Sequence, residues 1–499
     1  SITRFVEAGD PDGDRLTLSL SGEPAGVTFT DAGNGVAELT ITPERSQAGQ
    51  TLSFTVQADD GNGGTVSEAL SFDVGDDFAA LEAGLPPVGF GSSSSAADVN
   101  GDGYVDFLLT GGSSSGPLAT LYLNDGAGGF TVGGENLTGV QRSSSAFGDV
   151  NNDGSPDLVI TGEDENNELA TTLYLNDGNG GFSEVDAGLI GVKNGSSTFG
   201  DINNDGNLDL IITGINADFS DETTLYLGEG TGGFLSSNFE LKGGDFSASA
   251  FGDVNNDGRL DLVTSGFSDG SSAGRHTTLY LNNGSGGFSV AGTNFQPVTR
   301  GSISLGDVNN DGNLDVLITG FDGEPIAKVY IGNGVGSFTE LLNEGLTGVS
   351  LSSSAFGDIN RDGNLDVILT GDTDNSSITE LYLGDGTGTF AEGNAGLPGV
   401  SYASSTVADI DKNGTVDLLI TGAEDTEMLY KNLTAPPPPT FTSTIPSRSV
   451  TTGGLFTATA STKFSSTALS LSQGESIPNV TFTDNGDGTA SFSFSPETS

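Results

Sequence analysis

An acidic, glycine-containing segment recurs seven times in this chain. Its copies begin 51, 52, 52, 54, 51 and 51 residues apart, at Asp98, Asp149, Asp201, Asp253, Asp307, Asp358 and Asp409. Self-similarity at a fixed period of this length indicates a repeat architecture, in which each copy is one supersecondary unit that packs on its neighbours. The fold therefore has to hold seven nearly identical units.

Each unit has the residue pattern of four short strands. A Ser-rich segment leads to Ala-Phe-Gly-Asp or a variant of it, an apolar run such as LDLIITG follows the acidic segment, and TTLYLND with a Gly-Gly-Phe turn completes the unit. Short β-branched runs separated by glycine turns predict strands joined by hairpins. Four strands per period match a propeller blade, so we predict an all-β chain: a seven-bladed β-propeller with partial immunoglobulin-like β-sandwich domains at both ends.

The last unit is incomplete at its end. It stops at residues 429–432 without a Gly-Gly-Phe strand, whereas residues 78–98 resemble residues 182–201. We therefore predict that the strand that begins at Phe78 completes the seventh blade and ties the two ends of the ring together.

Composition limits the partners and the chemistry. The formal net charge is −53, with 68 Asp and Glu against 15 Lys and Arg, which opposes binding to nucleic acid or to an anionic membrane surface. Cysteine is absent, so neither disulfides nor thiolate metal sites are available and oxygen ligands are the remaining option for a metal. No apolar run is long enough for direct insertion into a membrane.

The acidic segments have the ligand order of a calcium loop. Oxygen-bearing side chains stand at positions 1, 3, 5 and 9, glycine at position 6 allows a sharp turn, and position 7 offers its backbone carbonyl. Magnesium favours a stricter octahedron, and zinc favours Cys and His ligands, of which the chain has one His. We therefore predict about seven structural Ca²⁺ ions and no catalytic residues. The predicted ligands in the first four loops are Asp98, Asn100, Asp102, Tyr104, Asp106; Asp149, Asn151, Asp153, Ser155, Asp157; Asp201, Asn203, Asp205, Asn207, Asp209; and Asp253, Asn255, Asp257, Arg259, Asp261. Those in the last three loops are Asp307, Asn309, Asp311, Asn313, Asp315; Asp358, Asn360, Asp362, Asn364, Asp366; and Asp409, Asp411, Asn413, Thr415, Asp417.

Through Ala-Phe-Gly-Asp-Val-Asn-Asn-Asp-Gly-Asn-Leu-Asp and its variants, residues 78–434 resemble the FG-GAP or VCBS repeats of integrin α-subunit-like propellers. The resemblance implies seven blades, calcium loops on one face between the first two strands of a blade, and partner binding on the opposite face. This chain differs in carrying a loop in all seven units, where integrins have fewer. No domain is inserted between the repeats, so the sequence does not support an integrin-type metal-dependent adhesion site.

The flanking segments form a second repeat. Residues 480–499, VTFTDNGDGTASFSFSPETS, match residues 27–46 without a gap, and both resemble the immunoglobulin-like or cadherin-like modules of large bacterial surface proteins. We predict a first sandwich over residues 1–76 that lacks its opening strand, the propeller over 77–434, a Pro-rich linker over 435–440, and an incomplete second sandwich over 441–499. Such modules predict an extracellular location, secreted or attached to a cell surface, in a bacterium.

Comparison of the units points to a binding surface at one end of the predicted channel. The position seven residues before each loop varies among the units. The resemblance implies that this position enters the innermost strand from the face opposite the calcium loops. Together with their neighbours, these positions supply the candidate ligand-binding residues Phe90, Arg142, Lys193, Phe246, Arg300 and Tyr402. The alternative is that they are ordinary exposed loop residues. The loops between the second and third strands are acidic and are expected to be solvated, and His276 is expected at the surface.

These observations favour a non-catalytic, calcium-stabilised module for adhesion or for assembly on a cell surface or in a filament. Its partner would be a protein or glycan on a surface or matrix, or a neighbouring subunit. A glycan-binding lectin propeller is the alternative, weakened by the absence of Trp. A polysaccharide-degrading enzyme would need a converging cluster of carboxylates and basic groups away from the loops, and the sequence shows none.

Overall fold

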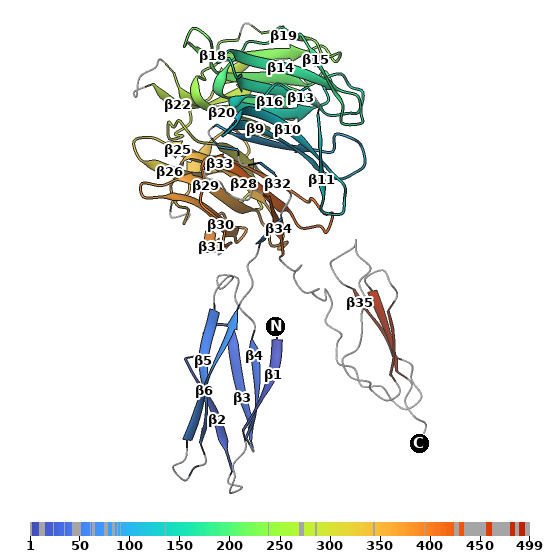
Figure 1. The fold of residues 1–499 in the computed structure, drawn as a ribbon, viewed down its shortest axis with the longest axis vertical. Coiled ribbons are helices and arrows are strands. Elements are labelled where there is room, and N and C mark those ends of the chain that lie inside the picture. Colours follow the sequence, from blue (N-terminus) through green and yellow to red (C-terminus); the bar gives the residue numbers. More distant parts are fainter. Residues whose placement is uncertain are drawn as a thin grey trace. The chain divides into compact units, whose positions relative to one another are not determined.

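The computed structural model describes residues 2–8, 15–41, 51–73, 78–433, 456–461, 480–484 and 489–494, apart from residues 23, 34, 60, 62–64, 82–84, 87, 90, 135, 238, 269–273, 285–286, 343–344, 394 and 424–428. All regular elements in these residues are β-strands, so the predicted all-β class is confirmed (Figure 1). Within these residues there is no helix with the length and apolar character that a membrane span requires. The chain divides into two compact units, residues 1–434 and 435–499.

The described part of the repeat region forms seven four-stranded antiparallel sheets, one for each sequence unit. The first three are β8 (Ser93–Ala97), β9 (Asp106–Ser113), β10 (Gly116–Asn124) and β11 (Phe130–Gly133); β12 (Gln141–Gly148), β13 (Asp157–Glu163), β14 (Leu169–Asn176) and β15 (Phe182–Val185); and β16 (Lys193–Gly200), β17 (Asp209–Ile215), β18 (Asp221–Gly228) and β19 (Phe234–Ser236). The next two are β20 (Asp245–Gly252), β21 (Asp261–Phe267), β22 (Arg275–Asn282) and β23 (Phe288–Val290); and β24 (Ile303–Gly306), β25 (Asp315–Phe321), β26 (Pro325–Gly332) and β27 (Phe338–Glu340). The last two are β28 (Ser350–Gly357), β29 (Asp366–Asp372), β30 (Ser377–Gly384) and β31 (Phe390–Gly393); and β32 (Ser401–Ala408), β33 (Asp417–Ala423), β34 (Leu429–Asn432) and β7 (Phe78–Ala80).

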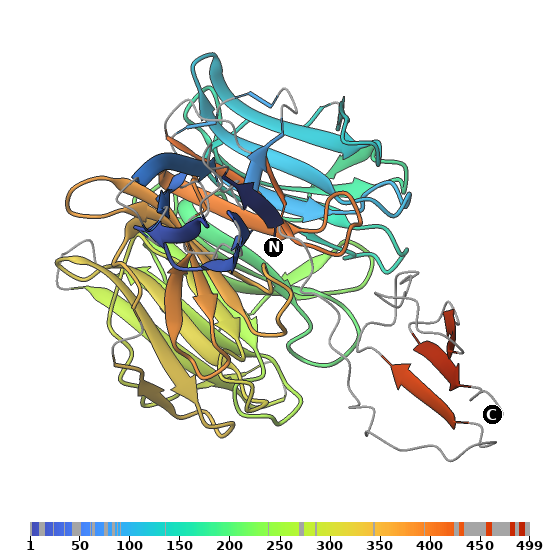
Figure 2. The same ribbon diagram turned by 90° about the horizontal axis from the view of Figure 1, so that it is seen from below.

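The first strands of the sheets surround a common axis, which is the arrangement of a β-propeller. Each of β8, β12, β16, β20, β24, β28 and β32 contacts the next, and β32 contacts β8 (Figure 2). Serine hydroxyls join neighbouring sheets across these contacts, with Oγ to Oγ distances of 2.7 Å between Ser196 and Ser249 and 3.0 Å between Ser94 and Ser404. Small hydroxyl side chains suit the axis, because the strands converge there and leave little room between their backbones.

The core lies between the sheets and is built from their second and third strands. Leu210 and Ile212 of β17, for example, are fully buried and pack with Val159 of the preceding sheet and with Tyr226. The Tyr226 hydroxyl accepts a hydrogen bond from the Ile190 backbone N–H at 3.0 Å, so this buried polar group is satisfied. Equivalent bonds from backbone N–H groups reach Tyr174, Tyr280, Tyr330 and Tyr382.

The predicted closure of the ring is confirmed. Strand β7 pairs with β34 in the seventh sheet, with Phe78 opposite Asn432 and Ala80 opposite Tyr430. Phe78 is only 5 % exposed and packs in the core cluster that contains Leu418 and Ile420. A strand that precedes the first sheet thus supplies the outer edge of the last one.

The N-terminal module consists of two three-stranded sheets. One has the order β1 (Ile2–Glu7), β4 (Val36–Ile41), β3 (Val27–Gly33), and the other has the order β2 (Thr17–Ser21), β5 (Thr51–Asp59), β6 (Thr65–Asp73). Leu39 and Ile41 of the first sheet pack with Leu52 and Phe54 of the second, so the two sheets enclose one core, as in a sandwich.

The C-terminal unit contains the counterpart of the first of these sheets. Its order is β35 (Phe456–Ser461), β37 (Thr489–Phe494), β36 (Val480–Asp484). Phe494 pairs with Val480 and Phe456, as Ile41 pairs with Val27 and Ile2 in the first module. The predicted boundaries at residues 76, 434 and 440, and the Pro-rich linker, lie outside the described residues and stay predictions.

The expectation that His276 is exposed was wrong. His276 lies in β22 opposite Gly266, forms a bridge with Val298, and is 7 % exposed. The pKa of this imidazole is lowered to about 4, mainly because the ring is buried. The ring is therefore neutral at physiological pH.

Ring closure by β7 makes a direct prediction for stability. Phe78→Ala should lower the free energy of unfolding by about 3–5 kcal/mol, because it removes a buried aromatic side chain from the strand that completes the last blade. Leu342→Ala, which truncates a side chain that is 74 % exposed, is the matched control and should have little effect. Urea unfolding in calcium measures both, and equal midpoints for the two variants would contradict the closure.

Candidate metal centres and axial ring

The acidic loops each connect the first strand of a sheet with the second, and their side chains fold inward around a tight turn. In the third loop, Asp201 accepts hydrogen bonds from the backbone N–H groups of Asp205 at 3.1 Å and Gly206 at 2.9 Å, and Asn203 Oδ1 accepts from Asp205 at 2.9 Å. Gly206 has a φ of 87°, which explains why glycine recurs at the sixth position. The turn thereby gathers the oxygens of positions 1, 3 and 5.

The ninth-position aspartate connects the loop to the rest of its sheet. Asp209 is fully buried, its Oδ2 accepts from the Ile202 N–H at 3.0 Å, and its Oδ1 accepts from the Gly228 N–H at the end of the third strand at 2.8 Å. The same pair of bonds is present in all seven loops, at Asp106, Asp157, Asp209, Asp261, Asp315, Asp366 and Asp417.

These buried carboxylates are electrostatically unfavourable without a cation. Burial is the largest cause that raises the pKa of the ninth-position carboxyl groups. Neighbouring aspartates of the same loop also raise this pKa, whereas the backbone hydrogen bonds lower it. The pKa reaches about 6 at Asp209, Asp261, Asp315, Asp366 and Asp417. A bound cation would favour the ionised form.

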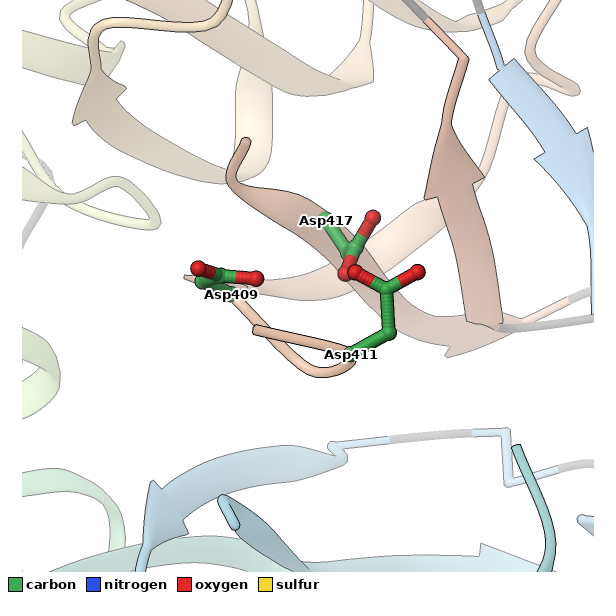
Figure 3. Close-up of side chains that lie close together, drawn as sticks. All are labelled: Asp409, Asp411 and Asp417. Carbon is green, nitrogen blue, oxygen red and sulfur yellow. The ribbon is translucent and has the colours of Figure 1, made fainter. Parts of the chain in front are cut away.

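Two further observations test whether a metal ion fits. In the first loop, Asp98 Oδ1 is buried without a hydrogen-bond partner among the described residues, which leaves an acceptor to be satisfied. In the seventh loop, oxygens of Asp409, Asp411 and Asp417 lie within 4.8 Å of one another (Figure 3). All donors at positions 1, 3, 5 and 9 are hard oxygens, and their number and charge fit calcium. All 35 predicted ligand positions lie in these loops or at the first residue of the strand that follows, and their coordination of an ion stays a prediction.

A second set of sequence-predicted residues lies at the other end of the first strands. Seven residues separate Arg142 from Asp149, which corresponds to about 23 Å of extended strand. Arg142, Phe246, Arg300 and Tyr402 line one cavity of about 120 Å³ at the axis, where every sheet contributes; the remaining sheets supply Gly91, Asn194 and Leu351. We call these seven residues the axial ring. Phe90 lies outside the described residues, and Lys193 is adjacent to the ring but does not line this cavity.

The axial ring has an unusual backbone. All seven residues have φ between 48° and 64°, in the left-handed region that favours glycine. In five sheets a register shift marks a bulge at this point. Arg, Phe, Leu and Tyr each carry a cost of about 1–2 kcal/mol in this conformation, which glycine would avoid. Six ring positions therefore carry side chains although their left-handed backbone conformation favours glycine. Strained backbone of this kind is common at functional sites.

Comparison with known proteins agrees with the repeat. The model of the FG-GAP-like repeat matches residues 98–160, 149–212, 201–264, 307–369 and 358–420, which together are more than half of the chain. The chain belongs to the FG-GAP-like repeat family. The bacterial Ig domain matches residues 1–73, so the predicted N-terminal immunoglobulin-like module is also confirmed.

Curated proteins give no match to this FG-GAP-like chain. Among solved structures, a mutant of Aleuria aurantia lectin in complex with α-methyl-L-fucoside is similar at 13% identity and a TM-score of 0.38, over 62% of this chain and 99% of the lectin. The intramolecular trans-sialidase from Ruminococcus gnavus in complex with oseltamivir carboxylate is similar at 14% identity and a TM-score of 0.27, over 86% of this chain and 98% of the enzyme. These scores are too low to support an inference.

The loops of this FG-GAP-like propeller also contact one another around the axis. Asn152 at the fourth position of the second loop donates to Asn207 Oδ1 at the seventh position of the third loop, at 2.8 Å. Asn256 and Asn310 repeat this bond to Asn313 and Asn364, at 2.7 and 2.8 Å. At the junction of the last and first loops, Lys412 Nζ lies 4.2 Å from the centre of the Tyr104 ring. These neighbouring loops are therefore joined by direct side-chain contacts.

Sequence reasoning missed two functional candidates on the ring end of this FG-GAP-like propeller. Glu163, 5 % exposed, accepts from Arg142 at 3.0 Å and from Lys193 at 3.2 Å, so it holds both cations in place. Phe219 projects from a loop that the acidic composition predicts to be solvated, and it is 82 % exposed. A lone aromatic residue within a polar loop was the signal that could have identified it.

The difference between the seventh loop and the others gives a charge-swap test. Asp205→Asn removes one of the three carboxylates of the third loop, and the bound calcium count should fall by one at low calcium. The double variant with Asn203→Asp recreates the arrangement of Asp411 and Asn413 and should restore the ion. Native mass spectrometry counts the ions. Equal counts for the wild type and the single variant at limiting calcium would contradict the predicted ligand set.

Proposed function

We propose that this chain is a calcium-stabilised, non-catalytic module of a bacterial extracellular or cell-surface protein that serves adhesion or surface assembly. The combination of FG-GAP-like repeats, a bacterial Ig domain and a propeller fits a surface module. Calcium ions would occupy the seven loops, and the opposite face of the propeller would engage a protein, a glycan or a neighbouring subunit. The loops thereby have a structural role, and the ring end has the binding role.

This proposal rests on one observation: the acidic loops and the axial ring lie at opposite ends of the first strands of the propeller. One end gathers carboxylates whose ninth-position members are buried in every sheet. The other end presents Arg300 and Tyr402 on a left-handed backbone that glycine would adopt at lower cost. Arg300 lies over the Phe246 ring, with 5.1 Å between the guanidinium carbon and the ring centre, so a cation and an aromatic face are presented together.

The size and charge of the axial cavity indicate what it would receive. Its volume of about 120 Å³ is well below the ~300–1,000 Å³ of small-molecule sites, so it suits one inserted side chain or a single functional group of a larger partner. The Arg142 charge is paired with Glu163, whereas Arg300 lies over the Phe246 ring in a chain whose net charge is −53. Arg300 is thus the ring residue that favours an acidic or polar group at this end.

Glycine substitutions separate a binding role of the ring from a packing role. The variant Arg300→Gly with Tyr402→Gly should keep or raise the melting temperature in calcium, because glycine relieves the left-handed backbone, and it should lose adhesion. Beads coated with the 499-residue chain are tested for aggregation with one another and for retention on fibronectin-coated and mucin-coated surfaces. Wild-type beads should adhere in calcium and detach in EGTA.

Two outcomes would contradict the proposal. A clear fall in the melting temperature of the glycine variant would assign the ring to packing. A melting temperature of the wild type that is the same in calcium and in EGTA would remove the structural role of calcium, because a ligand that binds the folded state has to stabilise it.

A further inference from the structure

A groove lies between the second and third sheets on the ring end of the propeller. It is formed by the loop between β13 and β14, the loop between β17 and β18, and the segment that enters β16, and its volume is about 550 Å³. This volume is within the ~300–1,000 Å³ range of small-molecule sites, and it is larger than the axial cavity. The groove is therefore the more suitable of the two for a whole ligand.

Phe219 forms an exposed aromatic wall of this groove. At 82 % exposure it is the most exposed large hydrophobic side chain among the described residues. Its φ of 57° adds backbone strain to the cost of an aromatic ring in water. The loop that holds it is ordered by its own bonds: Phe219 N–H donates to the Asn216 carbonyl at 3.0 Å, and Asn216 Oδ1 accepts from the Asp218 N–H at 3.0 Å. The ring is thus presented by a rigid turn.

The second wall of the groove has the same kind of turn. Asp164 Oδ1 accepts from the N–H groups of Asn166 and Glu168, each at 2.8 Å, and the Asn167 N–H donates to the Asp164 carbonyl at 3.1 Å. Glu168 and Asp218 are exposed, and both line the groove. Each rim therefore offers a carboxylate acceptor on an ordered loop.

Lys193 supplies a donor at the base of the groove. Its side chain is 13 % exposed, its Nζ lies 3.2 Å from Glu163 Oε1, and it is 5.8 Å from the centre of the Phe219 ring. The ion pair with Glu163 keeps the ammonium group beside the ring. A lysine ammonium carries three donors, so a ligand can share it with Glu163.

The charges and the hydrogen-bonding groups of the groove together favour a neutral ligand. An anionic ligand would be repelled by Glu168 and Asp218, and an ammonium ligand would offer no acceptor to the Lys193 donors. A hydroxyl group both donates and accepts hydrogen bonds, so it can pair with the carboxylates and with the ammonium group. An apolar face on the same ligand would cover the Phe219 ring. A pyranose ring combines hydroxyl groups on its edge with C–H groups on its face.

We propose that this groove binds one pyranose unit of a neutral glycan, stacked on Phe219 and hydrogen-bonded through Lys193, Glu168 and Asp218. The inference rests on the proposed function, since it names a ligand class for the ring end of a surface module. It assigns that ligand to the groove and not to the axial cavity.

The test is saturation-transfer difference NMR on the 499-residue chain in calcium with the methyl glycosides of glucose, galactose, mannose and N-acetylglucosamine. Glucuronic acid and glucosamine serve as an anionic and a cationic probe. At least one neutral glycoside should bind, with its strongest signals from one face of the ring. Phe219→Ala should weaken this binding by about tenfold or more, as truncation of a central contact residue does, while Phe219→Tyr should retain it.

Matched variants keep the outcomes separate. Leu342→Ala, another exposed truncation, should leave glycoside binding unchanged. The inference is overturned if no neutral glycoside binds, if a charged probe binds more tightly than every neutral one, or if Phe219→Ala binds like the wild type. Each variant is also melted in calcium and in EGTA. A missing calcium response would overturn the proposed function whether or not a glycoside binds.

Discussion

The buried ninth-position aspartate is the interaction on which each blade depends. Its two oxygens join the start of the loop to the end of the third strand, so one side chain fixes the first three strands of a sheet relative to one another. The same carboxylate is far from water and close to two other aspartates, and its pKa is raised accordingly. The fold therefore concentrates negative charge at sites where a divalent cation can offset it, in a chain with few positive side chains of its own.

Neighbouring blades are joined to one another by side-chain contacts. Serine hydroxyls at the first strands and asparagine side chains between the loops connect neighbouring sheets. Because β7 closes the last sheet, the propeller has no free end from which the sheets can separate. A closed ring of sheets can hold the seven axial-ring residues in a left-handed backbone conformation. The acidic loops and the axial ring are thus two ends of one scaffold.

The sequence predicts the parts of this structure that depend on local pattern. Period, strand alternation and turn chemistry identify the blades, the loops and the closing strand at Phe78. Features that depend on packing between blades are not predictable in this way. The burial of His276 follows from its place opposite Gly266, and the pairing of Glu163 with both Arg142 and Lys193 joins residues from two sheets. The left-handed backbone of the axial ring carries no glycine in six of its seven positions, so residue type does not reveal it.

Calcium in the loops can be observed directly as anomalous difference density from crystals grown in calcium chloride, with data collected at a wavelength where calcium scatters anomalously. We predict one peak in each of the seven loops, enclosed by the oxygens of positions 1, 3, 5, 7 and 9. Loops without peaks at millimolar calcium, with the ninth-position carboxylates bonded only to backbone N–H groups, would contradict it.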